Sequence, residues 1–177
     1  KNDCYEDVYE IGGTPQRFIQ KSVVGGRCMT NSNLMILCYE LLNDFDAVSL
    51  YPSAMSMMGF LKGLPKKLLG DPQLKYDFLK KQDGYFVEIV ITKVGVKREF
   101  PLLSFIDENG VRNWSNDMIG KTMYINKISL EDAIEFQNIE FKVVRGYYYN
   151  DGKNESIKSV IKTLFNERKK WKLQDNP

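Results

Sequence analysis

The strictest constraint on the fold is the alternation of side chains along residues 84–94. Large apolar residues occupy every second position of this stretch, and the positions between them carry a more mixed set. A period of two is typical of a β-strand that places one face on a hydrophobic core. We therefore predict a strand here, and further strands at residues 124–128 and 140–149. The apolar positions are Tyr85, Val87, Ile89 and Ile91, and the positions between them are Phe86, Glu88, Val90 and Thr92.

Two later segments have the pattern of helices. Ser129 is predicted to be the N-cap of a helix that runs to about Gln137, because Glu131 and Asp132 follow in the first turn. Residues 155–172 repeat apolar side chains at helical spacing, which predicts an amphipathic helix. Its apolar stripe consists of Ile157, Val160, Ile161, Leu164 and Phe165.

The middle of the first third combines a strand pattern with a helix start. Residues 41–50 have the β-branched and apolar content of a buried strand. Pro52 suits the first position of a short helix that continues over residues 54–61, and Tyr51 before it is expected to be extended. Residues 12–15 (Gly-Gly-Thr-Pro) are predicted to form a turn. With 43% hydrophobic residues the chain can bury a sizeable core, and the sum of these segments predicts an α+β fold.

Composition narrows the chemistry that the chain can perform. It has no histidine and a formal net charge of +2, so overall charge does not indicate a nucleic-acid binder. Catalysis would have to rely on carboxylates, backbone groups, lysine and arginine, with hard metal ions. The three cysteines have no metal-ligand spacing and suit reduced thiols in an intracellular compartment. No apolar run is long enough to cross a membrane, so we expect no membrane partner.

Asp46 is the most informative single residue. A carboxylate near the end of an apolar strand is costly to bury unless a cation meets it, and a hard divalent ion would do so. The turn that follows, from Ser49 to Pro52, would expose backbone amides at the start of a helix, where anions bind. Cation and amides together could hold a metal-bound triphosphate. The alternative is a structural aspartate at a strand end, which is the more frequent role of such a residue in isolation.

Residues 46–53, with the pattern Asp-x-x-Ser-Leu-Tyr-Pro-Ser, resemble the first palm motif of family B DNA polymerases. The resemblance implies that Asp46 ligates two Mg²⁺ ions, with Mn²⁺ as an alternative, and that the carbonyl of Ala47 completes one ion's site. It implies that Ser49 and Leu50 offer backbone amides to the triphosphate. It also implies that the Tyr51 ring lies under the deoxyribose and excludes a 2′-hydroxyl.

Upstream, the segment Gly25-Gly26-Arg27 resembles the Tyr-x-Gly-Gly element that the family carries between its exonuclease and polymerase domains. That element contacts the template strand, so the resemblance implies DNA binding by Gly25, Gly26 and Arg27. Val23 stands at the tyrosine position, which leaves a close approach of the glycine backbone and an Arg27–phosphate contact as the candidate interactions. The alternative is a glycine bulge in a strand.

Near the end of the chain, Arg168 and Lys172 are candidates for binding phosphate. Arg168 continues the apolar row of its helix, and Lys172 lies one turn further along. Arginine can grip a phosphate through paired hydrogen bonds, and the helix resembles the first fingers helix of the family. The alternative for Arg168 is a salt bridge to a neighbouring carboxylate. Three other lysines of the helix are expected on another side, in solvent: Lys158, Lys162 and Lys169.

The resemblance also divides the chain. It implies an N-terminal segment at residues 1–20 leading from the exonuclease side, a palm with its first motif at 21–62, a palm insertion at 63–152, and the base of a fingers helix at 153–177. The expected architecture is a palm-type antiparallel sheet with packed helices, an inserted β-rich subdomain and the start of a fingers helix. In protein-primed members of the organellar and viral branch, the inserted region contacts the primer protein and the duplex.

We therefore expect a fragment of a DNA-directed DNA polymerase that extends a primer 3′-hydroxyl with dNTPs by a two-metal mechanism. Its partners would be primer–template DNA, dNTP and a terminal primer protein, at a viral replication site, in an organelle or in plasmid-bearing cytoplasm. The second catalytic aspartate of the family is not found, so the isolated chain is expected to be inactive. One alternative is a non-catalytic nucleic-acid-binding or docking module derived from a palm. Another is a different metal-dependent phosphoryl-transfer enzyme, which Tyr51 disfavours.

Overall fold

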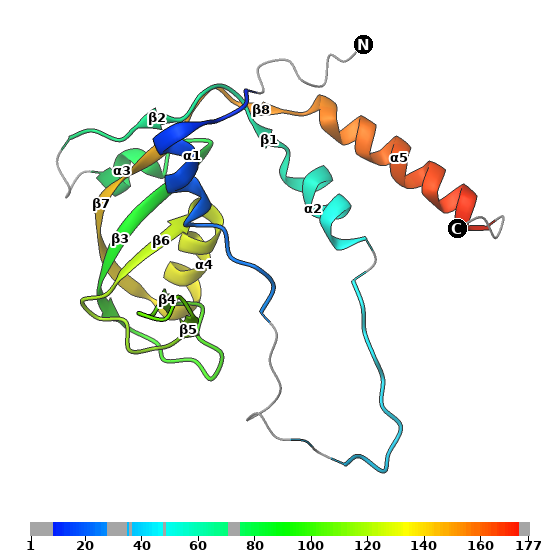
Figure 1. The fold of residues 1–177 in the computed structure, drawn as a ribbon, viewed down its shortest axis with the longest axis horizontal. Helices are drawn as coiled ribbons and strands as arrows, with labels where there is room; N and C mark the ends of the chain where they lie inside the picture. Colours follow the sequence, from blue (N-terminus) through cyan, green and yellow to red (C-terminus); the bar gives the residue numbers. More distant parts are fainter. Residues whose placement is uncertain (1–8, 28–34, 36, 48, 71–74, 174–177) are drawn as a thin grey trace. The chain divides into compact units, whose positions relative to one another are not determined.

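The computed structural model describes residues 9–27, 35, 37–47, 49–70 and 75–173. The chain divides into two compact units (Figure 1). The first unit comprises the described residues of Lys1–Val23 and Leu61–Asn154, and the second those of Val24–Phe60 and Glu155–Pro177. Helices and antiparallel sheets are both present, which confirms the α+β class.

The first unit is built on a four-stranded antiparallel sheet in the order β2-β7-β3-β6. The predicted central strand is confirmed with its bounds unchanged, and its apolar positions are the buried ones. Alternate side chains of a strand point to opposite faces, so this strand presents one fully apolar face to the core. The strands are β2 (Lys66–Lys67), β3 (Gly84–Val94), β6 (Thr122–Asn126) and β7 (Ile139–Tyr149).

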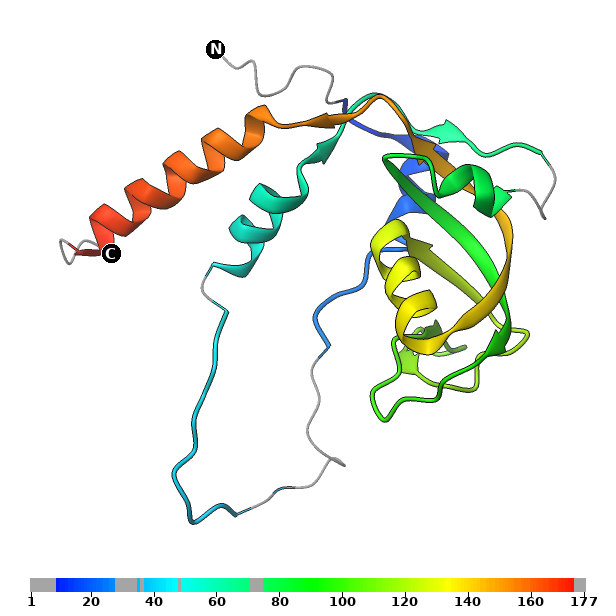
Figure 2. The ribbon, with the colours of Figure 1, turned by 180° about the vertical axis from the view of Figure 1, so that it is seen from behind.

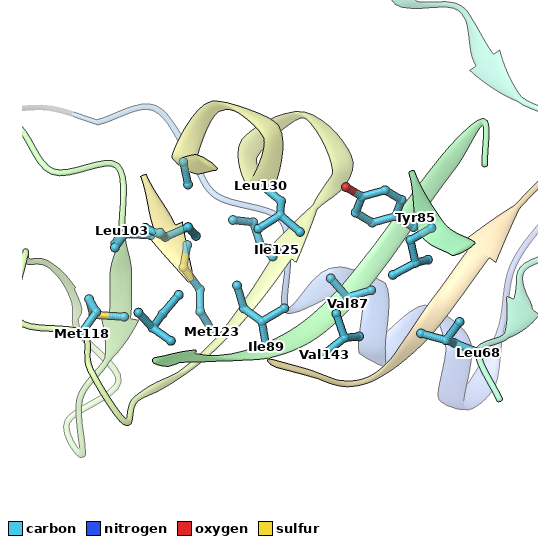
Figure 3. Close-up of a cluster of buried hydrophobic side chains, with 14 residues drawn as sticks. Leu68, Tyr85, Val87, Ile89, Leu103, Met118, Met123, Ile125, Leu130 and Val143 are labelled. Atoms are coloured by element: carbon cyan, nitrogen blue, oxygen red, sulfur yellow. The ribbon is translucent and has the colours of Figure 1, made fainter. Parts of the chain in front are cut away.

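Helix α4 (Lys127–Gln137) covers the apolar face of this sheet, as Figure 2 shows. Leu130 of the helix points toward Ile125 of β6 and the apolar side chains of β3 (Figure 3). The prediction that Ser129 caps this helix is wrong. The cap is Asn126, whose side-chain oxygen accepts a hydrogen bond from the Ser129 N–H at 3.0 Å. The predicted strand at 124–128 accordingly ends at Asn126, because the chain turns into the helix there.

Gln137, at the end of α4, is a buried polar side chain that ties a loop to the helix. Its exposed fraction is 0%. Its Oε1 accepts a hydrogen bond from the Leu102 N–H at 2.6 Å, and its Nε2 donates to the Val96 carbonyl at 3.3 Å and to Asn116 Oδ1 at 3.1 Å. A buried amide with its hydrogen bonds formed fixes the surrounding loop in one arrangement.

Gly146 lies where β7 passes closest to β3. A Cβ atom at this position would lie 2.8 Å from the Val87 Cγ1 atom and closer still to the Phe86 carbonyl oxygen. The register shifts just beyond, between Glu88 and Ile89. Close approach of two backbones is a recognised reason for glycine within a strand, and it explains the Gly-Tyr-Tyr sequence that begins at Gly146.

The opposite face of the sheet is partly covered by α1 (Gly13–Gln20), a helix where a turn was predicted. Its Phe18 ring lies edge-on to the rings of Tyr124 and Tyr147, with centroids 5.3 Å away in each case. These contacts place residues 9–23 in the first unit. The same unit contains the short helix α3 (Lys75–Leu79) and a hairpin of β4 (Ser104–Ile106) and β5 (Arg112–Trp114).

The second unit contains α2 (Leu50–Met58) and α5 (Ser156–Leu173), which pack against each other. The short strand β8 (Lys153–Asn154), which belongs to the first unit, forms a separate two-stranded sheet with β1 (Phe60–Leu61), the strand within which the division between the units falls. The predicted helix at 155–172 is confirmed by α5 within one residue at each end. Among the described residues no helix is long and apolar enough to span a membrane.

The strand predicted over residues 41–50 is not formed. Residues 41–47 are irregular, Leu50 already belongs to α2, and Val48 lies outside the described residues. Leu41 and Phe45 are 89% and 90% exposed. An apolar strand needs both a neighbouring strand and a covering layer, and within the described part of the chain nothing pairs with this segment.

Candidate functional site

The turn into α2 has a distinctive backbone. Ser49 adopts a left-handed conformation (φ 52°, ψ 46°), and Leu50 and Tyr51 are the first helical residues. The first intrahelical hydrogen bond runs from the Ser53 N–H to the Ser49 carbonyl at 2.9 Å. Pro52 therefore removes no hydrogen bond from the helix. The expectation that Tyr51 is extended and that Pro52 opens the helix is wrong, because the helix begins two residues earlier.

This turn is open to ligands. The first N–H groups of a helix have no intrahelical partner, so the amides after Ser49 can serve an anion. Leu50 is exposed and the Tyr51 side chain is 77% exposed. A ring so placed can lie against a flat or apolar part of a ligand that binds at the helix start.

Asp46 and Ala47 precede this turn in the irregular segment, and both are exposed. A carboxylate and a carbonyl are oxygen donors of the kind that Mg²⁺ prefers. Yet no group of three or more His, Cys, Asp or Glu side chains suited to a metal ion occurs in the described ranges. The donors at 46 and 47 fit Mg²⁺ in type, but they are too few to hold two ions by themselves.

Helix α5 packs against α2 and shares a pocket with it. A pocket of about 230 Å³ is lined by Pro52 and Met55 of α2 and by the face of α5 that ends in Arg168. Arg168 thus lies on the side of α5 that packs against α2, in line with the apolar stripe of this helix. The α5 residues of this pocket are Ile161, Leu164, Phe165 and Arg168.

A second pocket of about 260 Å³ lies between the same two helices and includes Lys162. Lys162 is exposed, as expected, but it lines this pocket, so it does not belong to a purely solvated side. Lys158 forms an ion pair with Glu155 one turn earlier. The remaining lining residues are Pro52, Ser53, Ser56, Met57, Ile161, Phe165 and Asn166.

The structure therefore brings some of the candidate residues together and leaves others apart. Arg168 shares a pocket with Pro52, the residue directly after Tyr51. Lys172 is exposed on the last turns of α5, beyond the pocket lining. Sequence reasoning did not identify Met55 as a pocket wall, although the methionine-rich composition of its helix was a usable signal.

Gly25, Gly26 and Arg27 lie in an exposed irregular segment. A Cβ atom added to either glycine would meet no atom within 4 Å. The alternative, a glycine bulge in a strand, is therefore not formed among the described residues, and no protein backbone approaches these glycines closely. Contact of these residues with DNA stays a prediction.

Comparison with known proteins identifies a family for the chain. The family model described as DNA polymerase type B, organellar and viral, matches residues 6–177. No curated protein matches the chain, and no solved structure does. Since the family model spans nearly the whole sequence, including the Asp46 turn and the Arg168 helix, the chain belongs to the organellar and viral type B DNA polymerases.

Proposed function

We propose that the second unit forms the nucleotide-binding part of a polymerase active site. The observation that carries the proposal is the pocket in which Arg168 of α5 lies beside Pro52 and Met55 of α2. Helix α2, which begins at the motif, and helix α5, which carries the phosphate-binding candidate Arg168, therefore lie in the same unit and pack against each other. A triphosphate bound at the start of α2 would have a cation within reach on α5.

In this proposal the chain's residues hold a dNTP while a primer 3′-hydroxyl attacks its α-phosphate and pyrophosphate leaves. The amides of Ser49 and Leu50 donate hydrogen bonds to phosphate oxygens, and the Tyr51 ring lies under the sugar. Arg168 binds the γ-phosphate through paired hydrogen bonds, with Lys172 adding positive charge. Such fixed donors stabilise charge that develops on the phosphates.

Asp46 and the Ala47 carbonyl would hold Mg²⁺, which when bound would neutralise charge on the triphosphate and activate the attacking hydroxyl. Because these donors are too few for two ions, we propose that a second carboxylate completes the site in the full enzyme. The 177-residue chain alone is then expected to give no primer extension.

We further propose that residues 21–62 and 153–177 belong to the palm and the base of the fingers, and that 63–152 form the inserted subdomain. The division into two units supports this assignment, since the chain leaves the second unit after Phe60 and re-enters it at Glu155. Primer–template DNA and dNTP are the implied partners. Contact with a terminal primer protein stays a prediction.

The test is nucleotide binding by the purified chain, measured by calorimetry with dTTP and Mg²⁺ or Mn²⁺. Arg168→Ala should weaken binding by about tenfold to a hundredfold, because charge-assisted hydrogen bonds contribute roughly 1.5–3 kcal/mol. Lys169→Ala removes a charge from the adjacent position of α5 and should have little effect. Asp46→Asn should abolish the dependence of dTTP binding on the metal ion. Tyr51→Val should reduce the preference of the chain for dTTP over the corresponding ribonucleotide.

Equal losses from Arg168→Ala and Lys169→Ala would contradict a specific phosphate contact. Absence of any dTTP binding with either ion would remove the main support for the proposal. Tight DNA binding without nucleotide binding would favour the alternative, a non-catalytic module derived from a palm.

A further inference from the structure

The first unit contains a pocket that the proposed active site does not use. It has a volume of about 280 Å³ and lies between the end of α1, the β4–β5 hairpin and β6. This volume lies just below the range for small-molecule sites, roughly 300–1,000 Å³. The pocket therefore suits one monomer unit of a larger ligand.

The polar part of the pocket is positively charged. Lys21 and Arg112 line it, and no acidic residue does so. The Lys21 Nζ atom lies 4.9 Å from the centroid of the Tyr124 ring. Arg112 donates a hydrogen bond from Nη1 to Ser104 Oγ at 2.8 Å, which orients its guanidinium. Both cations are thus positioned by the walls of the pocket.

The hairpin also contains a carboxylate, Asp107, and no ion pair joins it to Lys21 or Arg112 in the part of the chain that the structure describes. Asp107 follows the pocket residue Ile106, but its Oδ1 accepts hydrogen bonds from the Asn109 and Val111 N–H groups at 3.0 and 2.9 Å. Its Oδ2 accepts a further one from Asn113. These bonds hold the pKa of Asp107 below its usual value, with the Val111 and Asn113 contacts as the leading causes. Both oxygens of the Asp107 carboxylate therefore accept hydrogen bonds from groups of the hairpin itself.

The rest of the wall is apolar and aromatic. It is formed mainly by Phe105, Met123 and Tyr124. The Lys121 Nζ atom lies 3.6 Å from the centroid of the Phe105 ring, which adds a third cation next to the pocket. An inorganic anion needs only the cations. Cations beside an apolar, aromatic wall match a nucleotide, which joins a phosphate to a flat base.

We propose that this pocket holds one nucleotide of a single-stranded nucleic acid. Lys21 and Arg112 bind its phosphate, and the base packs against Phe105 and Met123. In a duplex the bases are stacked and paired, so only an unpaired base can reach such a wall. The site lies in the first unit and does not depend on the nucleotide site proposed for the second.

The test is binding of fluorescently labelled oligo-dT to the full chain, followed by anisotropy without metal ions or dNTP. Lys21→Glu and Arg112→Glu should each weaken binding about tenfold or more, as expected for loss of a phosphate contact. The matched control is Lys81→Glu, which makes the same charge change after α3, away from the pocket. It should weaken binding no more than about twofold. Thermal unfolding of each variant establishes that it is folded.

Changing the ligand tests the base contact without altering the protein. An oligonucleotide with abasic sites keeps the phosphates, and we expect it to bind several-fold more weakly than oligo-dT because packing of a base on an aromatic wall is lost. Equal affinity for the two ligands, or tighter binding of a duplex of the same length, would overturn the proposal. So would equal effects of the three charge reversals, or equal competition by polyglutamate. Because the assay contains neither dNTP nor metal, failure of the proposed active site would not alter these outcomes.

Discussion

The hydroxyl of Tyr85 predicts an unusual response to mutation. Tyr85 lies on β3 with an exposed fraction of 1%, and its ring is part of the core beside Leu130 (Figure 3). Among the described residues its Oη atom is buried and has no hydrogen-bond partner. A buried polar atom without a partner costs roughly 1–3 kcal/mol. Most core substitutions destabilise a protein. Removal of this hydroxyl should instead stabilise it, because the unsatisfied polar atom is lost.

Tyr85→Phe deletes the hydroxyl and keeps the ring. We expect it to raise the free energy of unfolding by about 1 kcal/mol, at the low end of that cost because a small void replaces the oxygen. For a unit of this size the melting temperature should rise by about 4 °C. The matched control is Tyr149→Phe. Tyr149 lies on β7 and pairs with Gly84 of β3. The Tyr149 hydroxyl is not among the buried atoms that lack a partner, so its removal should change stability by less than about 0.5 kcal/mol.

The pH dependence provides a second readout. Burial raises the pKa of Tyr85 most, and the negative charge that Tyr76 acquires when it ionises and that of Glu131 raise it further. When the pH exceeds the ordinary tyrosine pKa of about 10, the unfolded chain loses this proton and the folded chain keeps it. The folded state then binds more protons, so stability falls as the pH rises. Tyr85→Phe should reduce the slope of this alkaline loss.

Urea denaturation followed by circular dichroism, at neutral pH and above pH ~10, measures both effects. A loss of more than about 1 kcal/mol in Tyr85→Phe at neutral pH would refute the reasoning, because it would mean that the hydroxyl has a stabilising partner such as a bound water. An unchanged alkaline slope would show that Tyr85 does not contribute to the pH dependence.

Three further substitutions follow from the packing of the first unit. Gly146→Ala should lower the free energy of unfolding by about 1–3 kcal/mol, because the added Cβ would overlap the β3 backbone. Gly12→Ala is the control, since a Cβ at Gly12 meets nothing within 4 Å, and urea denaturation of both variants measures the difference. Gln137→Leu should cost about 1–3 kcal/mol and speed hydrogen exchange at the Leu102 amide, which loses its acceptor. Phe18→Ala should release α1 from the sheet, which faster tryptic cleavage at Arg17 would report.

Features that depend on local pattern were predictable from the sequence. The bounds of β3 follow from alternation alone, since a two-residue period already defines which face is buried. Helix α5 follows from its apolar stripe, which also places Arg168 on the side that packs against α2. The turn at Ser49 was expected from the strand-like residues before it and the proline after it, although the helix begins earlier than predicted.

Features that depend on distant contacts were not predictable. Helix α1 begins with Gly13 and includes Pro15, which locally indicate a turn. Its observed partners are the rings of Tyr124 and Tyr147, more than a hundred residues later in the chain. Helical stability in proteins comes mostly from tertiary packing, so a propensity argument confined to the segment could not find this helix.

At residues 41–47 a strand was predicted and is not formed, and this difference affects the proposed metal site. Their apolar content indicates a buried strand, yet a strand is stabilised by its neighbours and not by its own sequence. Without a neighbouring strand in the described part of the chain, Asp46 and Ala47 are positioned only by their connection to the α2 turn. A carboxylate binds a cation tightly when its position is fixed before binding. We therefore expect the metal affinity of the chain to rise if a strand pairs with this segment, and the exposed Leu41 and Phe45 offer the apolar surface that such pairing would bury.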